Sequence, residues 1–158
     1  MSSEVSKAMR LNNLLIRLQG PILPAWHPEI EAEVVAILNE ASLVKYPSND
    51  QPSGARWQFW SKDGAHFLGN ESKFTIPKFL SSIEATRTLI QPGWGYLLRD
   101  DEDPRGKFAH VYTHSREWDF TPVYSSRHFA TTIELAFIRA ALGALLTIEA
   151  NNLQHKAH

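Results

Sequence analysis

The stretches Ser81-Ser82-Ile83-Glu84 and Thr131-Thr132-Ile133-Glu134 each open an apolar segment, and both fit the capping-box pattern. In that pattern a Ser or Thr hydroxyl accepts a hydrogen bond from the N3 amide, and a Glu reaches back to the N-cap amide. Each stretch therefore predicts the start of a helix, the first running through Ile90 and the second to about Ala150. The segments that follow differ, so shared helix chemistry explains the similarity better than an internal repeat.

Residues between the two stretches favour strands. Trp94 to Arg99 and Phe108 to Thr113 flank turn-forming residues, which predicts a hairpin, and a third strand is expected around Phe120 to Tyr124. On the N-terminal side, residues 56–60 alternate and are aromatic, so they also predict a strand, whereas residues 46–54 have loop composition.

Two helices are predicted in the first forty residues. Apolar residues recur at i, i+3, i+4 and i+7 from Leu11 to Leu18, which is the spacing of one helix face. Pro28 suits the first position of a second helix, with several glutamates close behind it. Helices outside hairpin-linked strands indicate the α+β class, as a compact helix–sheet–helix sandwich with a small antiparallel sheet of three to four strands. We expect a single domain over residues 1–150 and a frayed tail over residues 151–158.

Composition narrows the class of protein. The chain has 158 residues, 43% hydrophobic and 21% charged, with a net charge of −1, so no long-range field should draw it to nucleic acid or an anionic membrane. The absence of cysteine excludes disulfides, thiolate catalysis and thiolate zinc sites. Glu134 and Arg139 interrupt the longest apolar segment, so no membrane span is predicted. A soluble, cytoplasmic protein is expected.

Several short motifs carry a resemblance to a family. Pro77-Lys78-Phe79, Ser82-Ile83-Glu84-Ala85, Leu89-Ile90 and Gly93-Trp94 together resemble small phage and prophage-type proteins related to the phage ABA sandwich domain. The closing segment, residues 130–142, is similar to the alanine- and leucine-rich helix that ends those proteins. The resemblance implies a helix–sheet–helix sandwich of phage-associated origin. It implies no biochemical activity, cofactor or catalytic residue.

One polar cluster is a candidate ligand site. Ser125, Ser126, Arg127 and His128 precede the last predicted helix and could place hydrogen-bond donors at its N-terminus, where anions bind. An ordinary polar connection is the alternative interpretation, and it is the favoured one. No serine lies in a Gly-x-Ser-x-Gly elbow, so no catalytic residue is assigned.

The acidic turn Asp100, Asp101, Glu102 and Asp103 lacks the ligand spacing of an EF-hand loop. We interpret it as a solvated hairpin tip, with a partner-binding surface that mimics phosphate as the alternative. His110 and His114 would lie about 13 Å apart on a strand at 3.3 Å per residue, too far to share one zinc ion. No metal site or cofactor is predicted.

Aromatic residues on or near strands raise the question of nucleic-acid binding, since such rings can stack on bases. The residues concerned are Trp57, Phe59, Trp60, Trp94, Tyr96, Trp118 and Phe120. Strand aromatics also pack a sheet against helices, and the near-neutral charge favours that interpretation.

The last predicted helix is apolar on more than one side. A surface helix usually shows one apolar stripe, so either other parts of the chain cover this helix or a second chain does. The candidate homodimer interface consists of Phe137, Ala140, Ala141, Ala144 and Leu145.

The leading functional hypothesis is a non-enzymatic module that binds an unidentified protein, with inhibition of a host or defence factor as one such role. One alternative is a small enzyme or anion-binding domain that uses residues 125–128 together with Arg99, Arg116 or a histidine. The other alternative is nucleic-acid binding through the strand aromatics.

Overall fold

The computed structural model describes residues 6–19, 28–47, 55–71, 73–100, 103–116 and 119–156. Side chains are described for these residues except at positions 46–47, 55–56, 114–116, 119–124 and 152–156. The elements along the described chain are α1 (Lys7–Leu18), α2 (Pro28–Leu38), β1 (Ser42–Pro47), β2 (Ala55–Trp60), β3 (Phe67–Asn70), α3 (Ile83–Arg87), β4 (Trp94–Arg99), β5 (Lys107–Arg116), β6 (Asp119–Ala130) and α4 (Ile133–Lys156). Helices packed on antiparallel strands confirm the predicted α+β class.

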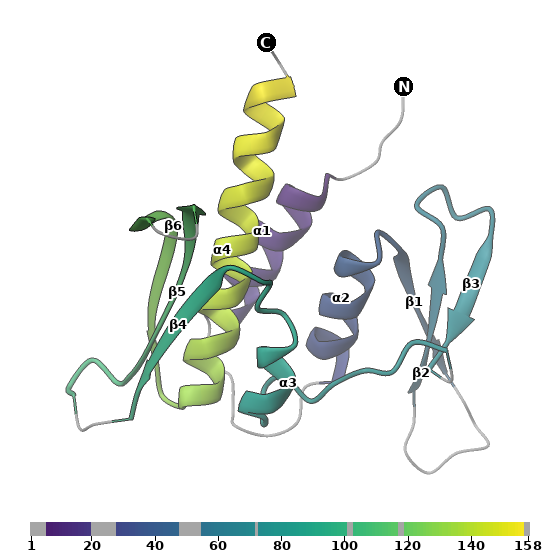
Figure 1. Cartoon of the computed structure of the whole chain (residues 1–158). Helices are drawn as coiled ribbons and strands as arrows, with labels where there is room; N and C mark the ends of the chain where they lie inside the picture. The colour runs from purple at the N-terminus through teal and green to yellow at the C-terminus, as the bar shows by residue number, and fades with distance from the viewer. Residues whose placement is uncertain are drawn as a thin grey trace.

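The described strands form two antiparallel sheets of three strands each, in the orders β1-β2-β3 and β4-β5-β6. Figure 1 shows the sheets at opposite ends of the molecule with the helices between them. The sequence predicts a small antiparallel sheet of three to four strands, and the described residues contain two such sheets. The prediction missed β1, which includes Tyr46 and Pro47 from the expected loop, because a proline is tolerated at the sheet edge where β1 lies.

Helix α4 packs between the β4–β5–β6 sheet and α1, and it also contacts α3 (Figure 1). Four of the candidate dimer-interface residues, Phe137, Ala140, Ala141 and Ala144, have an exposed fraction of 0%, and Leu145 is 5% exposed. The same chain therefore buries the helix on both sides. The prediction that these residues contact a second copy finds no support, because they are not accessible to one.

Arg139 links α4 to two neighbouring elements, β6 and α1. Its guanidinium donates one hydrogen bond to the Phe129 carbonyl in β6, at 3.1 Å, and another to the Leu18 carbonyl at the end of α1. Helices leave their last carbonyls without partners inside the helix, and Arg139 donates to one of these carbonyls, that of Leu18. Burial lowers the pKa of Arg139 from its ordinary value.

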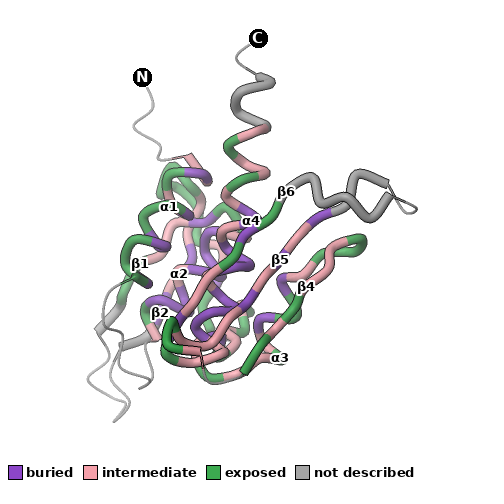
Figure 2. The backbone as a smooth tube through the Cα atoms, turned by 90° about the vertical axis from the view of Figure 1, so that its left-hand side faces the viewer, coloured by how far each residue is buried: buried purple, intermediate pink, exposed green. Residues whose placement is uncertain are grey.

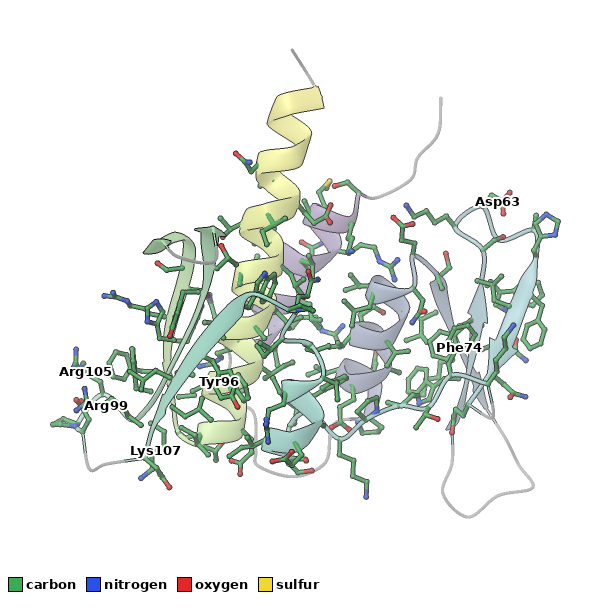
Figure 3. All side chains as sticks on the ribbon, viewed as in Figure 1. Asp63, Phe74, Tyr96, Arg99, Arg105 and Lys107 are labelled. Atoms are coloured by element: carbon green, nitrogen blue, oxygen red, sulfur yellow. The ribbon has the colours of Figure 1, made fainter. Side chains whose placement is uncertain are left out.

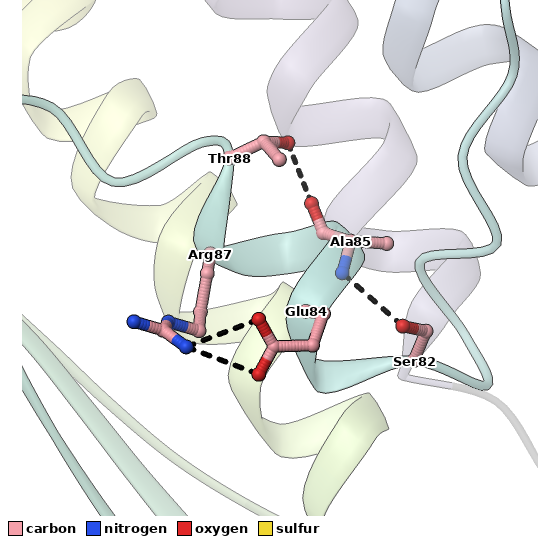
Figure 4. A network of polar contacts seen from close by, with 5 residues as sticks. All are labelled: Ser82, Glu84, Ala85, Arg87 and Thr88. Atoms are coloured by element: carbon pink, nitrogen blue, oxygen red, sulfur yellow. Dashed lines mark hydrogen bonds and ion pairs between the residues drawn. The ribbon is translucent and has the colours of Figure 1, made fainter.

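Both predicted helix starts exist, shifted by one residue. Ser82, not Ser81, caps α3 by accepting a hydrogen bond from the Ala85 amide at 3.2 Å, and Thr132 caps α4 in the same way through the Leu135 amide. The Glu84 carboxylate accepts two hydrogen bonds from Arg87, each at 3.0 Å (Figure 4). Glu84 is therefore the N2 residue of α3, and its carboxylate pairs with Arg87. The predicted hydrogen bond from the N-cap amide to this glutamate, which completes a capping box, is wrong for α3.

Both helix ends also differ from expectation. Helix α3 ends at Arg87, three residues before the predicted Ile90, and α4 continues to Lys156 through most of the segment predicted to be a frayed tail. After Gly143 the sequence contains no glycine or proline. The two asparagines at positions 151 and 152 are only weakly unfavourable in a helix, so nothing in this stretch stops α4.

The two faces of the β4–β5–β6 sheet differ in their cover. Its inner face packs on α4, and the Tyr96 ring lies 5.0 Å from the Phe137 ring between centroids. Among the described elements, none packs on the outer face, which is turned toward the viewer in Figure 2. We call this outer surface the open face; the side chains on it belong to Leu97, Arg99, Phe108, His110, Tyr112, Ser125, Arg127 and Phe129.

The turn between β4 and β5 depends on Gly106. This residue has a φ of +106°, its amide donates to the Asp103 carbonyl, and an added Cβ would lie 2.5 Å from the Ala130 carbonyl oxygen. Gly64 offers a matched comparison, because its φ is +75° and a Cβ there would meet nothing within 4 Å.

We predict that Gly106→Ala destabilises the protein more than Gly64→Ala does. Both variants carry the strain of a left-handed backbone, about 1–2 kcal/mol. Only Gly106→Ala adds a steric clash with backbone, worth about 1–3 kcal/mol more. Urea denaturation followed by circular dichroism measures both free energies of unfolding, and equal losses for the two variants would contradict the prediction.

Candidate functional site

The open face carries a row of rings along its central strand. Phe108, His110 and Tyr112 alternate on β5, with centroid distances of 6.5 Å between the first two rings and 5.0 Å between the last two. The intervening Ala109 and Val111 are fully buried against α4. The rings and the small residues lie on different faces because successive side chains of a strand point to opposite sides of the sheet. Strand β5 therefore buries small residues and displays large rings.

Neighbouring strands extend the row on both sides. Phe129 on β6 is paired with Phe108, and their ring centroids are 5.0 Å apart. Gly95 on β4 is paired with Tyr112, whose ring covers it so closely that an added Cβ would lie 2.5 Å from ring atoms. Leu97, opposite His110, is 50% exposed. The result is an apolar surface that spans three strands.

A pocket of about 290 Å³ lies at one end of the open face, beside the turn between β4 and β5, which we call the hairpin end. Its lining consists of Arg99, Asp103, Arg105, Phe108, Arg127 and Phe129. Figure 3 shows Arg99 and Arg105, with Lys107, gathered at this end of the sheet. Three arginines and one aspartate thus surround two phenylalanine rings.

The Asp103–Arg105 pair contributes an ion pair to the lining. The Asp103 carboxylate accepts hydrogen bonds from Arg105 Nε at 3.0 Å, from Nη2 at 2.9 Å and from the backbone amide at 2.8 Å. These bonds, with the Arg105 and Arg99 charges, lower the pKa of Asp103 to about 2. The Arg105 guanidinium also lies 4.3 Å from the centroid of the Phe129 ring, within cation–π distance.

His110 lies in the middle of the ring row. Burial lowers its pKa, and the Arg127 charge lowers it further, so the imidazole is mainly neutral near pH 7. Its Nε2 atom is buried and has no hydrogen-bond partner among the described residues. The positive charge of the open face therefore comes from the arginines at its hairpin end.

The predicted ligand cluster at residues 125–128 does not converge. These residues belong to β6, not to a connection, so they alternate between the two faces. Ser125 and Arg127 lie on the open face, whereas Ser126 and His128 face α4, where a Cβ on Gly143 would overlap Ser126 Oγ and lie 3.3 Å from His128 Nε2. The prediction that these residues place donors at the N-terminus of α4 gains no support, because they lie along β6 and Thr132 provides the cap of that helix.

Both described residues of the acidic turn are paired. Asp100 Oδ1 forms an ion pair with Lys107 Nζ at 2.8 Å, and Asp103 forms one with Arg105. Asp101 and Glu102, the other two residues of the predicted partner surface, lie outside the described residues. At the described positions the turn is a set of short-range ion pairs at the rim of the pocket.

None of the described aromatic side chains named from the sequence lies on the open face. Trp57 and Phe59 are buried in the core, Tyr96 packs on Phe137, and Trp60 packs on Phe67. Trp118 lies outside the described residues, as does the side chain of Phe120. The signal for the open face was the alternation of large rings with small residues from Phe108 to Thr113, which the sequence interpretation did not use.

Comparison with protein-family models, curated proteins and solved structures finds no match to this chain. Within the described ranges, no helix has the length and apolar character to cross a membrane. No group of three or more His, Asp or Glu side chains in the same ranges is placed to hold a metal ion.

We predict that His128 makes folding sensitive to acid. Burial lowers its pKa below the ordinary 6.5, and Arg139 adds to the effect. The unfolded chain therefore binds a proton that the folded chain rejects, and the free energy of unfolding falls as the pH drops below about 6.5. His110 contributes in the same direction.

Denaturation of the wild type and His128→Gln between pH 5 and 7.5 measures this effect. The variant should show a shallower loss of stability, while His66→Gln, at an exposed histidine, should keep the wild-type slope. A His128→Gln slope equal to that of the wild type would show that His128 does not contribute.

Proposed function

We propose that the protein is a non-enzymatic interaction module that binds a partner protein through the open face of the β4–β5–β6 sheet. The observation that carries the proposal is the uncovered row of rings on β5 beside exposed Leu97 and the arginine-lined pocket. Cores of protein interfaces are enriched in aromatic residues and arginine and depleted in lysine. An apolar surface with a polar rim is the usual form of such a binding site.

The positions of Ser126 and His128 favour binding over catalysis. Nucleophilic catalysis needs a hydroxyl and a base within reach of each other and of substrate. These two residues face α4 beneath the sheet, and among the described side chains of the proposed enzyme group, Arg99 and Arg127 line the pocket. Ser125 shares the open face with Arg127, but it is not among the residues that line the pocket.

Nucleic-acid binding is the second candidate, favoured by one observation. Rings at alternate positions of a central strand are the arrangement that stacks unpaired bases. Against it, the cationic groups among the described side chains of the face lie at one end, where Asp100 and Asp103 also lie, and the net charge is −1. A phosphate backbone needs positive charge along its path, so a protein partner is the better proposal.

The phage-associated origin implied by the sequence resemblance stays a prediction. It is compatible with an interaction module, since a small protein that inhibits a host or defence factor needs a binding face and no catalytic group. The open face is the surface that such a role would use.

We predict that Leu97→Asp removes partner binding, whereas Val44→Asp retains it. Both residues are exposed aliphatics on edge strands, 50% and 43% exposed, but Val44 belongs to the other sheet. A carboxylate beside the ring row on the binding face should reduce recovery of the partner by about tenfold or more, equal to about 1.4 kcal/mol. Affinity capture from a lysate of source cells, quantified by mass spectrometry, compares the two baits.

The proposal fails if both variants recover the same proteins in the same amounts, or if the wild type recovers none reproducibly. Circular dichroism of each bait confirms that it is folded before capture, so that a loss of binding reports on the face and not on unfolding.

A further inference from the structure

We infer that the pocket at the hairpin end of the open face binds a side-chain carboxylate, a Glu or Asp of an extended partner segment whose next apolar residues lie along the ring row. This inference rests on the proposed function and adds the chemistry of the partner. The pocket lining has three arginines and one aspartate, a formal charge of +2. An anionic group therefore complements it, and an apolar group beside that anion complements the two rings.

Arg127 is the central binding group of this site. It is exposed, it projects from β6 onto the open face, and no described carboxylate lies within ion-pair distance of it. Its charge acts across the face, because it lowers the pKa of His110 on the neighbouring strand. A guanidinium binds a carboxylate through two parallel hydrogen bonds, which a neutral amide in the same place cannot equal.

The contact between Arg105 and Asp103 is an example of carboxylate binding within the pocket. Arg105 binds both oxygens of Asp103 at 2.9–3.0 Å while lying over the Phe129 ring. Ring and guanidinium together form one wall of the pocket.

The distribution of charge favours a single carboxylate over a polyanion. Beyond the pocket the ring row continues through His110, mainly neutral near pH 7, to Tyr112, with exposed Leu97 beside it. Phe108 and Tyr112 are four residues apart on β5, or about 13 Å, the length of roughly four residues of extended chain. A segment with a carboxylate at one end and apolar residues at alternate positions after it therefore matches the face.

The test uses two synthetic peptides, acetyl-Glu-Ser-Leu-Ser-Phe-amide and its counterpart with Gln in place of Glu. In an extended peptide the first, third and fifth side chains share one face. We titrate each peptide into isotope-labelled protein and follow chemical shifts by NMR. The Glu peptide should bind about fivefold to tenfold more tightly than the Gln peptide, the range expected for a hydrogen-bonded charge pair. Its shifts should include the Arg127 and Phe129 signals.

Variants separate this site from general charge effects. Arg127→Gln should abolish the difference between the two peptides, whereas Arg87→Gln should keep it, because Arg87 is an exposed arginine on α3 outside the pocket. Equal affinities of the two peptides for the wild type, with shifts at Leu97 and Tyr112, would overturn the carboxylate site and leave the open face as a binding surface.

Two further outcomes would also overturn the inference. The first is no shift with either peptide; the Leu97→Asp capture comparison then decides the proposed function separately. The second is Arg127-dependent binding of a fifteen-nucleotide oligothymidylate that is tighter than binding of the Glu peptide. That result would assign the arginines to phosphate and the rings to bases.

Discussion

The packing of α4 against α1 on one side and the β4–β5–β6 sheet on the other is the contact on which the rest of the structure depends. Small residues allow it: Ala136, Ala140, Ala141 and Ala144 are all fully buried, and Gly143 lies directly over Ser126 and His128. A larger side chain at these positions would force the layers apart and lose the close packing that protein interiors maintain. Arg139 adds a polar link, because its guanidinium binds carbonyls of both β6 and α1.

This packing also determines which surface remains open. Because α4 takes up the inner face of the sheet, β5 must place its small side chains inward, and the alternation of the strand sends its rings outward. The antiparallel register then brings residues from β4, the hairpin turn and β6 around Phe108. The arginine-lined pocket is thus a consequence of strand pairing, with no contribution from consecutive residues of one motif.

Much of the fold could be predicted from local sequence signals, whereas the site could not. Capping hydroxyls and apolar spacing locate the helices to within a few residues, since those signals act between near neighbours in the chain. The pocket joins Arg99, Arg105 and Arg127 through register, which a single sequence does not reveal. Grouping residues 125–128 as one site failed for the related reason that a strand divides consecutive side chains between two faces. For α4, the sequence left a second chain and the chain's own elements as equal explanations of its apolar surface, and the buried positions favour the chain's own elements.

Partner binding through the open face requires that its rings are accessible to solvent while the rings of the core are not. NMR with a soluble, neutral gadolinium chelate measures this directly, because the chelate broadens signals of accessible rings. We expect strong broadening of the Phe108, Tyr112 and Phe129 ring signals and little effect on Phe137 and Phe59, which are fully buried. Equal protection of all five rings would contradict this expectation, because another segment or another molecule would then have to cover the open face.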